Sequence, residues 1–376
     1  MFISRTEFES VLGPLQDLLD EDRRKREHAV LAQSQELEAV GLADASRSSF
    51  RLEAPLLQLP CGSFYLASHL LTGEMYSLRQ EIKSQLVSSN EQDRITREVA
   101  ILRSLNETSV QCSLLPRMMR AFQTPDSLYL LFKGKTTCDL STLLEAGPFS
   151  EAGLRFVGAC VAHALDILHN DLKLLYRNLM PENIMVLDNG YVTLMDYRLA
   201  RPDLGACRTL CGSPSYFSPE MVRGEVQGPL CDFWGLGVLL FELSDGELPW
   251  GSQANDDMTV LRRIAAHQFG ALRLPARVTL SSVPQLMSVL NQLLHPEASQ
   301  RLCGLRGREP QLRTHPFFAE VSWPKLLDSE LPSPLRDMAL DQFTSKMEDI
   351  DWEPAEPVAW SPGPGDETAW LEGYTV

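Results

Sequence analysis

The stretch Leu174–Ala200, LLYRNLMPENIMVLDNGYVTLMDYRLA, constrains the fold of this chain more than any other. An apolar start leads into a polar loop in which Asn183 follows Asn178 by five residues. Asn189-Gly190, a dipeptide typical of two-residue hairpin turns, then joins two short apolar strands. Asp196 stands at the end of the second strand. The pattern predicts a polar loop and a hairpin that present two amides and one carboxylate.

The composition is that of a folded protein larger than one ordinary domain. The chain has 376 residues, which suits one two-lobed unit with short extensions. Hydrophobic residues make up 44%, enough for a core. The net charge of −16 argues against nucleic acid as a partner, because phosphate backbones are bound by clustered Lys and Arg. Much of the excess is local, since eight carboxylates follow residue 345 with one lysine, Lys346.

Cysteine usage and hydropathy predict a reducing, cytoplasmic setting. The eight cysteines include no C-x-x-C pair, and the first residues, MFISRTEFES, do not resemble a signal peptide. We therefore expect reduced cysteines that are buried as small apolar residues. No stretch reaches about 18 uninterrupted apolar residues, so we expect no membrane span.

The opening stretch resembles the catalytic loop and metal-binding motif of protein kinases, H-R-D-x-x-x-x-N followed by D-F-G. Its start, Tyr-Arg, is the variant found in the AGC group of serine/threonine kinases. The chain is most similar to the catalytic domains of the cyclic-GMP- and cyclic-AMP-dependent kinases. The resemblance implies an α+β, bilobal protein-kinase fold, with a small β-rich N-lobe and a large helical C-lobe.

Three regions follow from this reading of the chain, and the second of them is divided into two lobes. Residues 1–50 are predicted to be a helical extension, which either packs on its own domain or serves as a dimer or partner helix. The kinase domain is expected over 51–325, with an N-lobe at 51–134 and a C-lobe at 135–325. The last region, 326–376, is acidic and rich in proline, and is predicted to be extended or disordered. Within the N-lobe we expect strands at 63–67, 75–82 and 128–132 and a helix near 91–105.

The nucleotide-binding parts implied by the resemblance are altered. Gly62 is the one glycine left in the expected phosphate loop, and Pro60 removes a backbone N–H donor there. Arg79 stands where a strand lysine is usual, and Glu98 follows nineteen residues later as its expected partner. Lys83 offers a less favoured substitute for that lysine.

Two further positions belong to the same pocket. Phe132 occupies the gatekeeper position, although a core aromatic explains it equally well. Asp139 matches the acidic residue that meets the ribose of the nucleotide.

The catalytic loop has lost the group that accepts the substrate proton. Asn178 replaces the catalytic Asp, and an amide is not basic near neutral pH. Met180 replaces the usual lysine, whereas both expected metal ligands, Asn183 and Asp196, remain. Arg198 replaces the last Gly of D-F-G, and its cation is predicted to fold back towards Asp196 and compete with a metal ion.

The activation segment is closer to the family pattern. Thr209 falls on the activating phosphothreonine of the motif T-L-C-G-T-P, and Arg177 is the cation expected to meet that phosphate. An unmodified threonine with a local hydrogen bond is the alternative. Asp232 is expected to hold the backbone of the catalytic loop, and Arg301 to pair with Glu220 of the A-P-E motif.

These features predict a pseudokinase, a kinase-fold regulator or scaffold that does not transfer phosphate efficiently. The alternative is a divergent serine/threonine kinase with weak activity, since catalysis in this family rests largely on placement and electrostatics. No cofactor is assured, and ATP with Mg²⁺ is expected to bind weakly if at all. Protein partners are expected to use the N-terminal helix, the lobes or the acidic tail.

Overall fold

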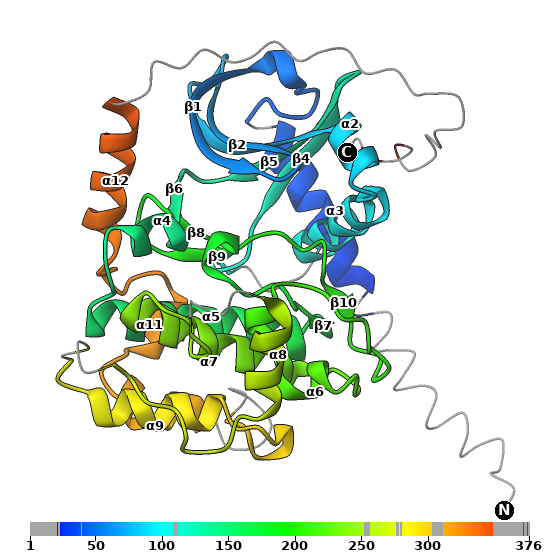
Figure 1. Ribbon diagram of the computed structural model, residues 1–376. Helices are drawn as coiled ribbons and strands as arrows, with labels where there is room; N and C mark the ends of the chain where they lie inside the picture. The colour runs from blue at the N-terminus through cyan, green and yellow to red at the C-terminus, as the bar shows by residue number, and fades with distance from the viewer. Residues whose placement is uncertain are drawn as a thin grey trace, which may run out of the picture.

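The computed structural model has two lobes, a twisted sheet above and a bundle of helices below (Figure 1). It describes residues 21, 23–38, 40–107, 112–251, 256–275, 278, 280–302, 311–348, 371 and 374. The predicted α+β, bilobal architecture, with a small β-rich N-lobe and a large helical C-lobe, is confirmed. Its two lobes are joined by the segment between β5 (Ser127–Lys133) and β6 (Thr136–Asp139).

The N-lobe is built on one antiparallel sheet of five strands. Their order is β1-β2-β3-β5-β4, with β1 (Phe50–Leu59), β2 (Gly62–His69), β3 (Met75–Ile82) and β4 (Met118–Gln123). The predicted strand at 75–82 has those bounds, and the predicted strands at 63–67 and 128–132 lie within β2 and β5. The sheet is buried on both faces, because alternate residues belong to two separate apolar cores.

Two helices follow β3. The short α2 (Lys83–Ser88) leads into α3 (Gln92–Asn106), which confirms the helix predicted near 91–105. The buried face of α3 carries Ile95, Val99 and Leu102 at helical spacing, and Glu98 lies on that same face. The sheet therefore receives an apolar helix face that also contains one carboxylate.

The C-lobe consists mainly of helices around a buried central helix, α5 (Glu151–Asn170). By length and composition α5 could span a membrane, but 89% of its most apolar window is buried inside the lobe. The other helices are α4 (Leu140–Glu145), α6 (Pro219–Val222), α7 (Pro229–Asp245), α8 (Asp257–Ala265), α9 (Val283–Leu293), α10 (Gln311–Thr314) and α11 (Trp323–Leu327).

Short strands position the site at the top of the C-lobe. β6 pairs with β8 (Ile184–Leu187), which pairs with β9 (Val192–Leu194), while β7 (Leu174–Leu175) pairs with β10 (Arg201–Pro202). Asn189-Gly190 lies in the loop between β8 and β9, but the predicted two-residue turn is wrong. Leu187 donates its backbone N–H to the Tyr191 carbonyl, which leaves a loop of three residues, and only Gly190 at its end adopts a positive φ, of 80°. β9 ends at Leu194, so Met195 alone separates the hairpin from Asp196.

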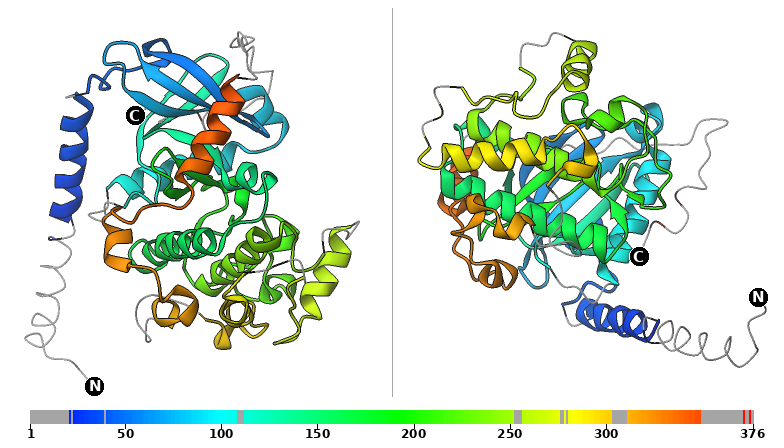
Figure 2. Two further views of the ribbon diagram at one scale, coloured as in Figure 1. Left: turned by 90° about the vertical axis from the view of Figure 1, so that its left-hand side faces the viewer. Right: turned by 90° about the horizontal axis from the view of Figure 1, so that it is seen from below.

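The N-terminal helix is part of the N-lobe at its C-terminal end only. Residues 23–38 are helical, and the predicted helix over 1–20 lies outside the described residues. Leu37 and Leu42 pack into the outer core of the sheet, with Leu42 fully buried. The outer core of the N-lobe therefore includes residues that precede position 51, where the kinase domain is predicted to begin. Both views in Figure 2 show the rest of this helix standing away from the body of the molecule, where Val30 and Leu31 are exposed.

The prediction that the chain is extended or disordered from 326 onward is wrong for the described part. α11 ends at Leu327, and α12 (Arg336–Glu348) is a helix that packs on β6 and α4 (Figure 2). Leu335 and Ala339 are buried against the C-lobe, and Lys346 donates a hydrogen bond to the Leu56 carbonyl of β1. The flanking prolines and the acidic excess concealed this helix in the sequence.

Candidate functional site

A cavity of about 380 Å³ lies between the lobes, beneath β1 and β2 and above the catalytic loop. It is lined from above by Leu57, Leu59, Pro60, Phe64 and Arg79. From below it is lined by Asp139, Asn178, Met180, Glu182, Asn183, Met185, Met195, Asp196 and Arg198. The structure thus brings most of the predicted nucleotide, catalytic and metal positions to one cleft.

The predicted pair between Arg79 and Glu98 is present and fully buried. Arg79 Nη1 donates to Glu98 Oε1 at 2.8 Å, which holds α3 against the sheet. The same guanidinium also donates from Nε to Glu81 Oε1 at 2.6 Å. Arg79 therefore bridges two carboxylates. Its planar guanidinium offers separate donors to each of them, whereas a lysine ammonium is a single compact charge.

Glu81 is a site residue that the sequence reading missed. It lies two positions after Arg79 on β3 and is 0% exposed. Successive side chains on a strand alternate between faces, so Glu81 had to lie on the same face as Arg79. The two-residue spacing from Arg79 was therefore the sequence signal that could have identified Glu81.

Arg198 folds back onto Asp196, as predicted. Its Nε donates to Asp196 Oδ1 at 2.9 Å and its Nη2 to Oδ2 at 2.6 Å, so the contact is bidentate. The backbone N–H of Arg198 donates to Oδ1 as well. Tyr197 lies between Asp196 and Arg198 in the chain and donates its backbone N–H to Glu98 Oε1 at 2.8 Å. This hydrogen bond connects the Arg198–Asp196 pair with the Arg79–Glu98 pair.

The result is one buried cluster of charges, named here the cleft cluster: Arg79, Glu81, Glu98, Asp196 and Arg198. Two arginines face three carboxyl groups, so the formal net charge of the cluster is −1 with every group ionised. Burial by itself would raise the pKa of Asp196, but the charge and hydrogen bonds of Arg198 outweigh burial and lower this pKa to about 2. Burial raises the pKa of Glu98, against the opposing charge of Arg79.

Because its pKa is lowered, the Asp196 carboxyl group stays ionised down to acidic pH. The folded pKa lies below the unfolded value of about 3.9. Its contribution to stability is therefore complete above that unfolded value and is lost only as the pH falls through about 2. At neutral pH Asp196 is ionised and held by Arg198.

The residues of the expected metal site do not fit a metal ion in this arrangement. A divalent cation here would need the carboxylate oxygens of Asp196, and both are already bound by Arg198. The second expected ligand, Asn183, donates its side-chain N–H to the Asn178 carbonyl at 2.9 Å. Arg198 and a metal ion would therefore compete for the same two oxygens.

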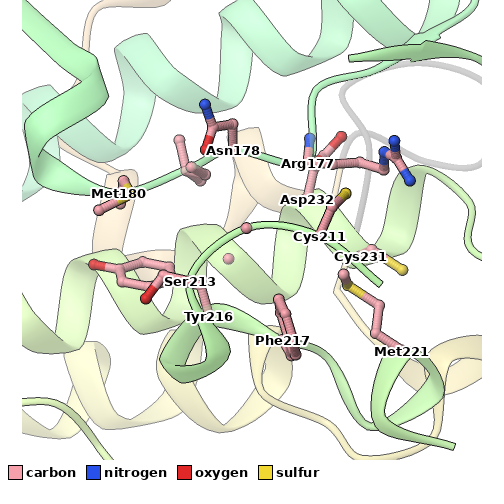
Figure 3. Close-up of a pocket in the computed structure, with 13 residues that line it drawn as sticks. Arg177, Asn178, Met180, Cys211, Ser213, Tyr216, Phe217, Met221, Cys231 and Asp232 are labelled. Atoms are coloured by element: carbon pink, nitrogen blue, oxygen red, sulfur yellow. Dashed lines mark hydrogen bonds between the residues drawn. The ribbon is translucent and has the colours of Figure 1, made fainter. Parts of the chain in front are cut away.

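Asn178 keeps the shape of the lost catalytic residue but acts as a donor. Its side-chain amide N–H donates to the Asp196 carbonyl at 3.2 Å, which ties the catalytic loop to the end of the hairpin. Figure 3 shows Asn178 and Met180 on the catalytic loop, across from Cys211 and Ser213 of the activation segment. Neither an amide nor a thioether can take a proton from a hydroxyl near neutral pH.

Gly62 has a packing role that the sequence reading did not foresee. It lies at the start of β2 opposite Glu81 of β3. A Cβ at this position would come within 1.9 Å of the Gln80 carbonyl oxygen, so only glycine allows the two strands to approach so closely. The single surviving glycine is thus explained by the sheet without any bound phosphate.

Three other predicted positions are placed differently from the simplest expectation. Lys83 is not a substitute for Arg79, because its Nζ donates to the Gln123 side chain and the Thr124 carbonyl. Asp139 lines the cleft but also caps α4, accepting hydrogen bonds from the backbone and hydroxyl of Thr142. Phe132 packs against Phe64, with ring centroids 6.2 Å apart, and lines a second cavity behind the segment that joins the lobes.

The activation segment is held by its backbone. Thr209 is exposed, and Arg177 Nη1 donates to its carbonyl oxygen at 3.3 Å rather than to its hydroxyl. Arg177 also contacts Cys207 Sγ at 2.8 Å, Gln227 Oε1 at 3.1 Å and the Leu199 carbonyl at 2.7 Å. In Figure 3 its guanidinium points away from the neighbouring Asn178. Arg177 therefore lies beside the activation segment, where a phosphate on Thr209 would need to reach it.

The structural landmarks of the C-lobe match their predictions. Asp232 accepts hydrogen bonds from the backbone N–H groups of Tyr176 and Arg177, at 2.9 and 2.7 Å. Arg301 forms a bidentate pair with Glu220, at 2.7 and 3.0 Å. Hydrogen bonds with Arg301 and the charge of Arg301 overcome burial and lower the pKa of Glu220. These contacts fix the catalytic loop and the activation segment to the helices below them.

Comparison with known proteins identifies the family. The protein kinase domain matches residues 60–318 of the chain. Serine/threonine-protein kinase N2 of Danio rerio is 31% identical over 77% of this chain and 29% of its own length. A cGMP-dependent protein kinase of Drosophila melanogaster is 28% identical over 80% of this chain and 30% of its own length.

A RAC family serine/threonine-protein kinase homolog of Dictyostelium discoideum is 30% identical over 70% of this chain and 56% of its own length. The chain belongs to the protein kinase family, and its relatives include members of the AGC group. It spans only about 30% of the length of the first two relatives.

Proposed function

We propose that this chain is a pseudokinase, a kinase-fold regulator or scaffold that does not transfer phosphate efficiently. The observation that carries the proposal is the bidentate contact of Arg198 with Asp196. Phosphoryl transfer in this family depends on metal ions that bridge the phosphates and are held by this Asp. Here an internal cation takes the place of the metal on the carboxylate.

Two further changes support the same conclusion. Asn178 supplies no base, and its side chain is engaged with the Asp196 carbonyl. Arg79 is committed to Glu98 and Glu81, so its positive charge is already neutralised before any phosphate arrives. Each change affects a different part of the chemistry, and reversing one of them does not restore the others.

The alternative is a divergent serine/threonine kinase with weak activity. One observation favours it, since the buried contacts that assemble an active kinase are all present: Arg79–Glu98, Asp232 with the catalytic loop, and Glu220–Arg301. A pseudokinase that acts through its shape needs the same contacts. Activity measurements therefore have to decide between the two proposals.

We propose that its partners are proteins in the cytoplasm, and not nucleic acids. The exposed part of helix 23–38 carries Val30 and Leu31 at 49% and 57% exposure, beside a run of mixed charge. The lobes and the acidic C-terminal region are the other candidate surfaces. The net charge of −16 opposes binding to a phosphate backbone.

A radiolabelled ATP assay on basic peptides, with Mg²⁺, tests the proposal. We expect no transfer by the parent protein and none by Asn178→Asp alone, because the cleft cluster still holds Asp196. The quadruple variant Arg79→Lys, Asn178→Asp, Met180→Lys, Arg198→Gly reverses all of these changes and is the one expected to gain activity. Transfer by the parent that disappears in Asp196→Ala would establish the divergent kinase instead.

A further inference from the structure

The cleft between the lobes offers no free positive charge to a polyanionic ligand. Two arginines line it, and both are already neutralised: Arg198 by its bidentate contact with Asp196, and Arg79 by Glu98 and Glu81. No lysine lines the cleft in the part of the chain that the structure describes. A phosphate group would therefore have to displace a carboxylate before it gained a cation.

Two other carboxyl groups of the same lining have no cationic partner. Glu182, in the catalytic loop, is exposed, and its side chain forms no ion pair or hydrogen bond with a described residue. Asp139 is 5% exposed, and its Oδ1 accepts both hydrogen bonds from Thr142, which leaves Oδ2 without a partner among the described residues. Whereas Oε2 of Glu81 and of Glu98 is sealed in the core, Oδ2 of Asp139 stays accessible.

These two carboxyl groups lie close enough to repel each other. Burial raises the pKa of Glu182, and the charge of Asp139 raises it further. Burial also raises the pKa of Asp139. Lys346 of α12 opposes that shift by its charge but forms no ion pair with Asp139, and its ammonium donates to the Leu56 carbonyl. A cation bound beside both carboxyl groups would relieve their repulsion.

The remaining wall of the cleft is mainly apolar. Leu57, Leu59 and Phe64 line it from the N-lobe, and Met185 and Met195 line it from the C-lobe. The volume of about 380 Å³ lies in the range of about 300–1,000 Å³ typical of small-molecule sites, which are mostly apolar with a few polar groups. This wall accommodates an apolar body, and the unpaired carboxyl groups accommodate one positive charge.

We propose that the cleft between the lobes binds a small organic cation, whose apolar body contacts the walls and whose ammonium or guanidinium group pairs with Asp139 and Glu182. Neither a phosphate group nor a metal ion takes part in this binding. The proposal rests on the proposed function, because it requires that Arg79 and Arg198 stay paired with carboxylates, and it adds the chemical class of the ligand.

The test compares three probes that share a naphthalene ring and differ in charge. They are 2-naphthylmethylamine, a cation at neutral pH, the neutral 2-naphthalenemethanol and the anion 2-naphthoate. Binding is followed in the full chain, without ATP or Mg²⁺, by the methyl signals of its 12 methionines, labelled with ¹³C. We expect the amine to shift Met180 and Met185, which line the cleft, and not Met258 on α8. It should bind about tenfold more tightly than the alcohol, and the naphthoate should bind most weakly.

Three variants locate the positive group of the ligand. Glu182→Gln removes an exposed charge and no hydrogen bond with a described residue, so it should fold normally and weaken the amine by about three- to tenfold without affecting the alcohol. Asp139→Asn keeps an acceptor oxygen to cap α4 and should weaken the amine by a similar factor. Asp188→Asn is the control, since it removes an exposed carboxylate outside the cleft and should change neither probe.

Four results would overturn the proposal. The first is no shift of Met180 and Met185 at millimolar amine, and the second is equal binding of the amine and the alcohol. The third is tighter binding of the naphthoate, which would mean that the arginines are open to anions. The fourth is a loss in Asp188→Asn as large as in Glu182→Gln, which would mean that overall charge attracts the amine.

The two proposals fail in different experiments. Phosphate transfer by the parent protein in the radiolabelled assay would overturn the proposed function. The probe titrations contain no ATP, so their outcome depends on the charge of the cleft and not on catalysis.

Discussion

Two buried ion pairs link distant parts of the chain, and they differ in how completely their polar atoms are satisfied. In the C-lobe, Arg301 meets Glu220 one to one, and its remaining donors bond the carbonyls of His295 and Leu230. In the cleft, Arg79 is shared between Glu81 and Glu98, and Oε2 of each carboxylate accepts no hydrogen bond from any described residue.

This difference indicates that the C-lobe pair stabilises the fold, whereas the pairs in the cleft belong to the part of the site that has changed. A buried pair with all its hydrogen bonds made is costly to break, because removing one partner leaves an uncompensated charge. The cleft cluster has three carboxyl groups, two arginines and carboxylate oxygens that accept no hydrogen bond from a described residue. Removing one carboxyl group therefore leaves two carboxyl groups paired with two arginines. The C-lobe pair therefore stabilises the fold, whereas the cleft cluster occupies the expected metal site and contributes less to stability.

The largest effect is expected from breaking the C-lobe pair. Arg301→Ala should lower the free energy of unfolding by about 3–5 kcal/mol, because Glu220 is left buried and unpaired. Arg223→Ala is the control, since its pair with Glu225 is exposed and worth under about 1 kcal/mol. Urea unfolding measures both. Equal losses would mean that burial does not distinguish these pairs.

A smaller loss is expected in the cleft. Glu98→Ala should destabilise by about 1–3 kcal/mol, because Arg79 retains Glu81 as its partner and the cluster loses its excess negative charge. The melting temperature should still fall clearly, since α3 loses its tie to Tyr197 as well. If Glu98→Ala melts like the parent, the pair does not hold α3. If it loses as much as Arg301→Ala, Glu81 does not share the charge.

Much of the site could be predicted because its contacts are carried by spacing along the chain. Three contacts were predicted correctly from residue positions in the motifs: Arg79 with Glu98, Asp232 with the catalytic loop, and Arg301 with Glu220. The return of Arg198 to Asp196 followed from a cation two residues from a carboxylate. The fold followed from the ordered series of motifs rather than from hydropathy alone.

The parts that were missed depend on packing that no motif describes. Glu81 was visible only through the alternation of β3, and the need for glycine at 62 only through the approach of two strands. α12 was concealed by the prolines before it, although Leu335 and Ala339 anchor it to the C-lobe. The predicted helix over 1–20 and most of the acidic tail lie outside the described residues.

The smallest effect is expected at the activation segment. Thr209→Ala should change stability by less than about 0.5 kcal/mol, because the side chain is exposed and Arg177 contacts only the backbone carbonyl. Thermal unfolding of the unphosphorylated protein measures this. A loss above about 1 kcal/mol would indicate that the hydroxyl itself holds the segment.

The central claim is that Arg198 occupies the metal site, and thermal-shift titration with ATP, with and without Mg²⁺, tests it most directly. The parent should show no Mg²⁺-dependent stabilisation by ATP, and Arg198→Gly, which frees Asp196, should gain it. A ligand at a hundredfold excess over its Kd stabilises by about 2.7 kcal/mol, so the gain would be visible. Arg201→Gly, three residues further along the chain, is the control and should behave like the parent. A Mg²⁺-dependent shift in the parent that Arg198→Gly leaves unchanged would contradict the account.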